Sequence, residues 1–82
     1  MPTLEDVLKD DWLKSVNPPH INSADQLSML WVRFGPGGPF DINAQTLLSA
    51  VIQNAFGVNV APEKLTATMT FAALGQLIGV AL

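Results

Sequence analysis

The chain has 82 residues, which is enough for one small domain and too few for a second. It contains no cysteine, and this excludes disulfides, thiolate catalysis and cysteine-rich metal sites. The formal net charge is −3 and the four basic residues are scattered, so no basic patch is available to neutralise a phosphate backbone. Nucleic acid is therefore excluded as an expected partner.

The sequence shows no pattern typical of a membrane span or a secretory signal. Its opening, MPTLEDVLKDD, is acidic and lacks an apolar run. No apolar stretch reaches the roughly 18 to 20 residues that cross a bilayer. We therefore expect a soluble, cytoplasmic protein without a membrane partner.

A first helix is predicted near the start of the chain. Thr3 can cap it, and Glu5 and Asp6 then lie in its first turn, where carboxylates meet the positive end of the helix dipole. The helix is expected to stop at Asn17-Pro18-Pro19, because a residue before proline is biased away from the helical conformation. Its apolar face would consist of Leu4, Val7, Leu8, Trp12 or Leu13, and Val16.

A second helix is predicted over 23–34, SADQLSMLWVRF, with Ser23 as its cap. Apolar residues recur in it at spacings of three and four: Leu27, Leu30, Trp31 and Phe34. The sequence GPGGP at 35–39 then predicts a tight irregular turn, because glycine permits positive φ and proline cannot extend a helix. This turn fits neither of the glycine-rich phosphate-binding patterns.

The clearest helical pattern begins just after Asp41 and stops at Phe56-Gly57. Two adjacent rows at spacing four form its core-facing stripe: Leu47, Val51 and Ala55, and Leu48, Ile52 and Phe56. Asp41 or Asn43 can accept hydrogen bonds from the free N–H groups of the first turn, and Gly57 tolerates the left-handed conformation that ends many helices.

A last helix is predicted in the tail, TFAALGQLIGVAL. The residues expected on its inward side are Phe71, Leu74, Leu77, Ile78, Ala81 and Leu82. The opposite side, formed by Ala72, Gly75, Gln76 and Gly79, would be smooth and uncharged. No alternation typical of strands is present, so the sequence predicts an all-α fold, a small bundle of four or five helices over residues 1–82.

From Phe56 the sequence FGVNVAPEKLTATMTFAALGQLI resembles the end of acyl and peptidyl carrier protein domains, and the resemblance extends over Phe40 to Ile78. It implies that Phe56-Gly57-Val58 ends the family's second helix and that Val60-Ala61-Pro62 forms the following turn. Leu65 then matches the short third helix, and Thr70 the cap of the last one. The implied fold is an acyl-carrier-protein-like helical bundle.

The same resemblance places the family's GGDSL or GFDSL signature on Pro39-Phe40-Asp41-Ile42-Asn43. Carriers of this family attach 4'-phosphopantetheine to the serine hydroxyl of that signature. Here Asp41 is retained, but Ile42 stands at the serine position and has no nucleophilic atom. We therefore expect Asp41 and Ile42 to occupy the cofactor-binding position with no cofactor attached.

The resemblance implies a carrier-like domain of a polyketide, nonribosomal peptide or fatty-acyl assembly system, which acts through contacts with other proteins or domains of that system. The expected partner-binding residues are Asn43, Gln45, Thr46 and Ser49. Because no ionisable side chain occurs over 42–62, electrostatic steering to a partner would be weak. Trp31 and Phe34 are either ordinary core or fill space that a pantetheine arm would touch.

Two other functions remain open from the sequence. One is a conventional acyl or peptidyl carrier that uses a different serine, with 4'-phosphopantetheine as its cofactor. The other is a self-associating helical adaptor or capsid-like module unrelated to carriers, so a homo-oligomer remains an alternative.

We expect no enzymatic activity, no catalytic residue and no metal site. His20 is the only histidine and lies beside a proline pair, with nothing in the sequence to support it as a catalytic base. Asp10 and Asp11 are neighbours in sequence and point in different directions on a helix, so they are expected to be solvated.

Overall fold

The computed structural model describes residues 3–14, 20–35 and 38–80 of the chain. Its elements are α1 (Leu4–Val7), the π-helical segment η1 (Leu8–Leu13), α2 (Leu27–Phe34), α3 (Ile42–Phe56), the 3₁₀ turn η2 (Pro62–Lys64) and α4 (Phe71–Ile78). Over these residues the only strand-like pairing is one isolated antiparallel bridge between Gln26 and Thr70. The predicted all-α fold, a small helical bundle, is confirmed.

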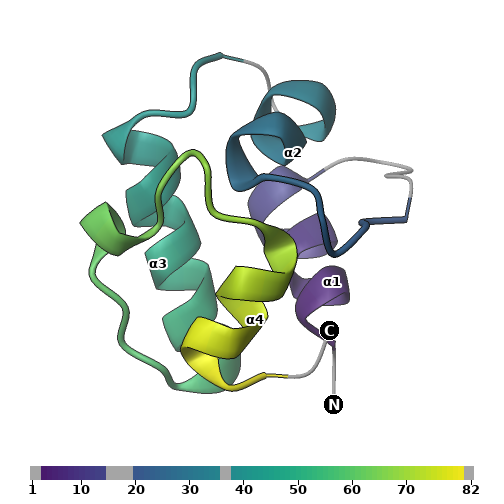
Figure 1. The fold of residues 1–82 in the computed structure, drawn as a ribbon. Coiled ribbons are helices and arrows are strands. Elements are labelled where there is room, and N and C mark those ends of the chain that lie inside the picture. Colours follow the sequence, from purple (N-terminus) through teal and green to yellow (C-terminus); the bar gives the residue numbers. More distant parts are fainter. Residues whose placement is uncertain (1–2, 15–19, 36–37, 81–82) are drawn as a thin grey trace.

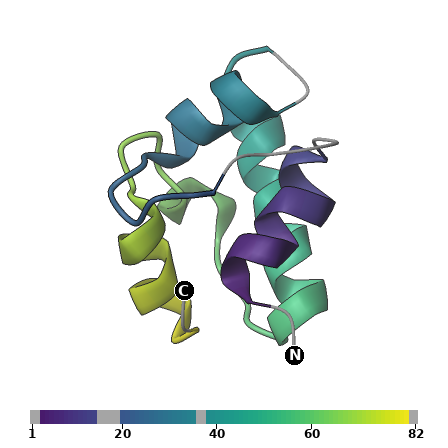
Figure 2. The same cartoon turned by 90° about the vertical axis from the view of Figure 1, so that its right-hand side faces the viewer.

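The helices enclose one apolar core. α3 runs along one side of the molecule, with η1 packed against it and against α2 (Figure 1). In Figure 2, α2 lies across one end of the bundle, and α4 lies on the side away from α1. The largest fully buried side chains come from all of these elements and their connections: Trp12, Phe71, Leu4, Leu8, Leu13, Leu27, Leu30, Leu48, Ile52, Leu65 and Leu74.

The first helix changes its winding at Leu8. Thr3 caps its start, as predicted, by accepting a hydrogen bond from Asp6 N–H. From Leu8 the helix has the wider π form, which closes hydrogen bonds across five residues instead of four. The wider turn lets both Trp12 and Leu13 face the core, and each is 1% exposed. The sequence predicted one or the other on the apolar face, and the structure places both there.

This helix ends earlier than predicted. Its last residue is Leu13, and Lys14 adopts the left-handed conformation with φ of 54° while its N–H bonds to the carbonyl of Lys9. The predicted inward residue Val16 and the predicted stop at 17–19 lie outside the described residues.

The second helix begins at Leu27 and not at Ser23, so the predicted Ser23 cap is wrong. Ser23 lies in a turn, and the carbonyls of Ser23 and Asp25 instead accept hydrogen bonds from the N–H groups of Ala72 and Phe71. The carbonyls of this turn therefore satisfy free N–H groups in the first turn of α4. A helix that began at Ser23 would use these carbonyls for its own hydrogen bonds.

α3 has the predicted bounds, and it ends at Gly57, whose φ is 71°. Its stripe is rotated from the prediction, because Leu48 and Ile52 are completely buried whereas Ala55 is exposed and Leu47 is only half-buried. Ala44, which was not predicted as core, is 1% exposed.

The predicted inward face of the last helix is corrected in two places. Leu77 is 45% exposed, whereas Gly75 is buried beside Phe71 and Ile78. The helix ends at Ile78, and Gly79 follows in the left-handed conformation, so the predicted smooth helical face does not extend to it. Ala81 and Leu82 lie outside the described residues.

Candidate functional site

The candidate site is the first turn of α3, where the sequence places the carrier signature. Ile42 is the first residue of this helix, and its side chain is 58% exposed. An aliphatic side chain at such a place contributes little to the core. Its exposure leaves it available to contact another molecule, although single exposed apolar residues are common on protein surfaces.

Asp41 determines where α3 begins. Its Oδ1 accepts hydrogen bonds from Asn43 N–H at 3.0 Å and Ala44 N–H at 3.3 Å, so Asp41 is the cap and Asn43 is not. These two bonds satisfy donors that the helix itself cannot use. The side chains of Ile42 and Asn43 are consequently held at the surface of a capped helix start.

Two aromatic residues support this helix start from inside. The indole N–H of Trp12 donates to the carbonyl of Ala44 at 3.2 Å, and the bond is buried. The ring of Phe40 meets that of Trp12 edge-on, with 6.2 Å between the centroids. Neither contact could be inferred from sequence spacing, because 32 residues separate Trp12 from Ala44.

Two predicted partner-binding residues are used within the molecule. Gln45 Nε2 donates to the carbonyl of Leu65, and the hydroxyl of Ser49 donates to the carbonyl of Val60. Both side chains are half-buried and hold the 57–70 connection against α3. Thr46 is exposed, and its hydroxyl donates back to the carbonyl of Ile42. Asn43 and Thr46 are thus the predicted partner residues that lie on the surface beside Ile42.

The remaining described serines differ in how their hydroxyls are used. The hydroxyl of Ser28 donates to the carbonyl of Ala67 at 2.8 Å, which ties α2 to the same connection. Ser23 is exposed in the turn before α2. Ser15 lies outside the described residues.

Trp31 belongs to the core of the molecule. It is 7% exposed and packs against Trp12 with 5.1 Å between the ring centroids. Its indole N–H is buried and has no hydrogen-bond partner among the residues that the structure describes. Phe34 is partly buried against the same core. Both residues therefore have the packing of ordinary core side chains.

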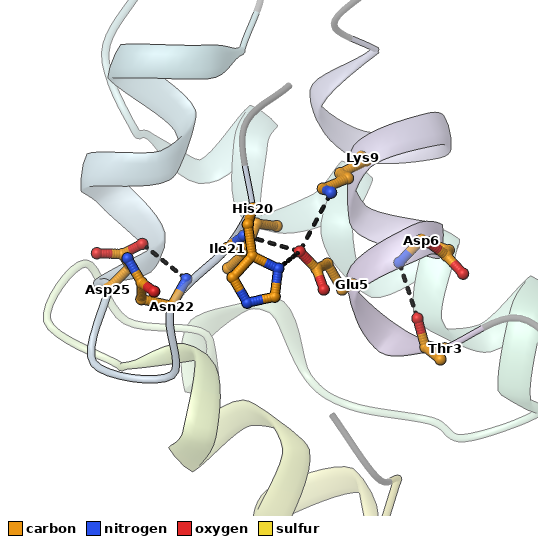
Figure 3. A network of polar contacts seen from close by, with 8 residues as sticks. All are labelled: Thr3, Glu5, Asp6, Lys9, His20, Ile21, Asn22 and Asp25. Atoms are coloured by element: carbon orange, nitrogen blue, oxygen red, sulfur yellow. Dashed lines mark hydrogen bonds and ion pairs between the residues drawn. The ribbon is translucent and has the colours of Figure 1, made fainter. Parts of the chain in front are cut away.

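A second polar site, which the sequence did not indicate, surrounds Glu5. Its Oε2 lies 3.1 Å from Lys9 Nζ and 2.9 Å from His20 Nδ1, and it accepts a hydrogen bond from Ile21 N–H at 2.8 Å (Figure 3). Glu5 therefore joins α1 to the segment that precedes α2. Asn22 N–H donates to Asp25 in the same segment.

These contacts lower the pKa of the Glu5 carboxyl. Burial of the carboxyl acts in the opposite direction and raises its pKa. The hydrogen bond from Ile21, the hydrogen bond and charge of Lys9, and the charge of His20 together outweigh burial, so the pKa lies below its ordinary value of 4.5.

A cavity of about 320 Å³ adjoins this cluster, and it is lined by Glu5, His20, Ile21, Asn22, Ser23 and Phe71. None of the predicted site residues on α3 contributes to its lining. His20 is 76% exposed, so it lacks the enclosed surroundings typical of a catalytic base. Asp10 and Asp11 are exposed, as predicted.

Over residues 3–14, 20–35 and 38–80 no three histidine, aspartate or glutamate side chains are grouped so that they could hold a metal ion. None of the helices in the same residues is both long and apolar enough to cross a bilayer. Comparisons of the chain with protein-family models, curated proteins and solved structures find no match.

Proposed function

We propose that the chain is a carrier-protein-like domain without a prosthetic group. In this proposal it belongs to a polyketide, nonribosomal peptide or fatty-acyl assembly system and acts by contact with other proteins of that system. The sequence resemblance over Phe40 to Ile78 is the origin of the proposal, and the order of helices along the chain is compatible with it.

The observation that carries the proposal is the position of Ile42. The resemblance matches it to the attachment serine, and in the fold it lies exposed at the first position of a helix capped by Asp41. A transferase would need access to a side chain at this place, and access is available. The missing element is the hydroxyl oxygen, without which no phosphodiester can form.

The internal hydrogen bonds of two serines favour this proposal over a conventional carrier with another attachment serine. The hydroxyls of Ser28 and Ser49 each donate a hydrogen bond to a backbone carbonyl of the 57–70 connection, and these bonds hold the connection in place. Attachment of a phosphopantetheine to either oxygen would remove its proton and break that bond. Ser23 has an accessible position but lies far from the carrier signature in sequence.

The surface proposed to meet a partner consists of Ile42, Asn43 and Thr46. It contains one apolar and two uncharged polar side chains, and all three are exposed. A partner would therefore recognise it by shape and apolar contact more than by charge.

Intact-mass spectrometry tests the proposal after incubation with coenzyme A and a phosphopantetheinyl transferase of broad specificity. The wild-type chain is expected to keep its mass. A gain of one phosphopantetheine group would contradict the proposal and establish the conventional carrier, and fragmentation would then locate the modified serine.

A further inference from the structure

The cavity beside Glu5 has the dimensions of a site for a small molecule. Its volume of about 320 Å³ lies at the lower end of the range of roughly 300–1,000 Å³ that is typical of such sites. Ile21 and Phe71 provide its apolar lining, and the rest of both side chains is buried in the core. Its polar lining consists of the side chains of Glu5, His20, Asn22 and Ser23.

The backbone N–H groups around this cavity are already used as hydrogen-bond donors. The N–H groups of Ile21 and Asn22 donate to the carboxylates of Glu5 and Asp25. The first two N–H groups of α4 donate to carbonyls of the turn that precedes α2. A helix start binds an anion through free N–H groups, and these N–H groups are occupied. The described surroundings of the cavity therefore offer an anion little to bind.

The polar side chains of the lining, in contrast, keep acceptor atoms for a ligand. The three contacts of Glu5 all end on Oε2, so none of them uses Oε1 (Figure 3). His20 meets the same oxygen through Nδ1, which leaves Nε2 as an acceptor in the neutral imidazole. Asn22 and Ser23 take part in the hydrogen bonds of this segment through backbone atoms, so their side-chain oxygens also remain for a ligand.

The charge of the lining favours a cation. The pKa of the Glu5 carboxyl lies below its ordinary value of 4.5, so this group is ionised at neutral pH. Its side chain is 17% exposed, and water screens its charge less than that of a fully exposed carboxylate. Lys9 pairs with Oε2 of Glu5 but is not part of the lining. The net charge of −3 also favours the approach of a cation from solution.

We propose that this cavity binds the primary ammonium group of a small alkylamine. An ammonium group has three N–H donors and no acceptor, and it therefore matches a lining in which acceptors remain and the neighbouring donors are used. One N–H donates to Oε1 of Glu5, and the others donate to acceptors among His20, Asn22 and Ser23. The alkyl part of the ligand lies against the apolar lining.

An NMR titration of the full chain with butylamine hydrochloride at constant pH tests the proposal. The backbone amide signals of the lining residues are expected to shift and to saturate in the millimolar range. Tetramethylammonium has the same charge but no N–H donor, and butyrate has a similar chain with the opposite charge, so both should shift these signals much less. Butylamine that leaves the signals unmoved, or tetramethylammonium that moves them equally, would overturn the proposal.

Glu5→Gln keeps the shape of the side chain and removes its charge, and it should weaken butylamine binding by about tenfold or more. Asp6→Asn is the matched control, because Asp6 is a carboxylate of the same helical turn that is exposed and does not line the cavity. It should bind butylamine as the wild type does. Equal binding by a folded Glu5→Gln chain and the wild type would contradict the assigned role of Glu5.

A second variant tests the cavity if Glu5→Gln fails to fold. Asn22→Ala combined with Ser23→Ala removes two exposed polar side chains and should weaken butylamine binding by about threefold or more. Thr46→Ala removes an exposed hydroxyl outside the cavity and should have no effect. Unchanged binding in the double variant would overturn the proposal. The carrier-like function rests on Ile42, which does not line this cavity, so each proposal can fail without the other.

Discussion

The indole N–H of Trp12 donates a buried hydrogen bond to the backbone carbonyl of Ala44, and so joins the π-helical segment of the first helix to the first turn of α3. Ala44 N–H also donates to Asp41, the cap of that turn. The first turn of α3, which carries Ile42, is therefore held from the core by Trp12 and at its own start by Asp41.

Trp12→Phe is expected to lower the free energy of unfolding by about 0.5–1.5 kcal/mol more than Trp31→Phe. Both changes remove an indole from the same aromatic pair and leave a phenyl ring. Only Trp12 loses a hydrogen bond, and its loss leaves the carbonyl of Ala44 buried without that donor. Urea unfolding of the two variants measures the difference.

Trp31→Phe serves as the control because the Trp31 N–H has no partner in the described part of the chain, so its removal abolishes no bond there. Equal destabilisation by the two substitutions would show that the Trp12 bond contributes nothing beyond packing. Amide exchange at Ala44 and Gln45 should also accelerate in Trp12→Phe and remain unchanged in Trp31→Phe.

Much of the helical pattern could be predicted because it depends on residues close in sequence. The caps Thr3 and Asp41, and Thr70, whose place at a cap the resemblance implied, accept hydrogen bonds from N–H groups two or three residues later. The glycine at 57 ends α3 in the left-handed conformation, as the sequence indicated. Each of these features requires only local geometry.

The corrections at Ser23, Gln45 and Ser49 share a different cause, which is contact between distant segments. Ser23 has the composition of a helix cap, but the turn around it is used by α4, about fifty residues later. Gln45 and Ser49 look like free polar residues on a helix wheel, yet carbonyls of the 57–70 connection accept hydrogen bonds from them. Helical periodicity contains no information about such partners.

Glu5→Gln is expected to lower the free energy of unfolding at pH 7 by about 1–2 kcal/mol, because the amide cannot form charge-assisted bonds with Lys9 and His20. The folded pKa of Glu5 lies below its ordinary value of 4.5. The carboxylate therefore contributes its stability above pH 4.5, and that contribution is lost as the pH falls through the folded pKa. Thermal unfolding of the variant and wild type from pH 7 to pH 3 should accordingly converge.

Asp6→Asn is the control for Glu5→Gln. Asp6 lies in the same first turn and near the same end of the helix dipole, but its side chain is exposed and is joined to neither Lys9 nor His20. Asp6→Asn should lower the free energy of unfolding by about 0.3–1 kcal/mol at low ionic strength. If the two variants lost the same stability at pH 7, the contacts of Glu5 with Lys9, His20 and Ile21 would have no separate effect.

Gly35→Ala is expected to destabilise the protein by about 1–3 kcal/mol. A Cβ at this position would overlap the carbonyl oxygen of Trp31, a backbone atom that cannot move independently of α2. The φ of Gly35 is −85°, which any residue can adopt, so the cost would come from this clash and not from the torsion angle. A denaturation midpoint equal to that of the wild type would contradict the close approach.

Gln45→Ala is expected to loosen the 57–70 connection, because the carbonyl of Leu65 loses its side-chain donor. Amide exchange at Lys64 and Leu65 should accelerate by roughly the factor of 5 to 10 that corresponds to about 1 kcal/mol. Thr46→Ala is the neighbouring control, since its hydroxyl bonds only within α3. It should leave exchange at Lys64 and Leu65 unchanged.

The most direct test of the carrier-like proposal restores the missing oxygen. Ile42→Ser, incubated with coenzyme A and a phosphopantetheinyl transferase, is expected to gain the mass of one phosphopantetheine group, which peptide mapping should place on residue 42. Asn43→Ser presents a hydroxyl one residue later on the same exposed turn and is expected to remain unmodified. A folded Ile42→Ser chain that gains no mass, or equal modification of both variants, would contradict the match of Ile42 to the attachment serine.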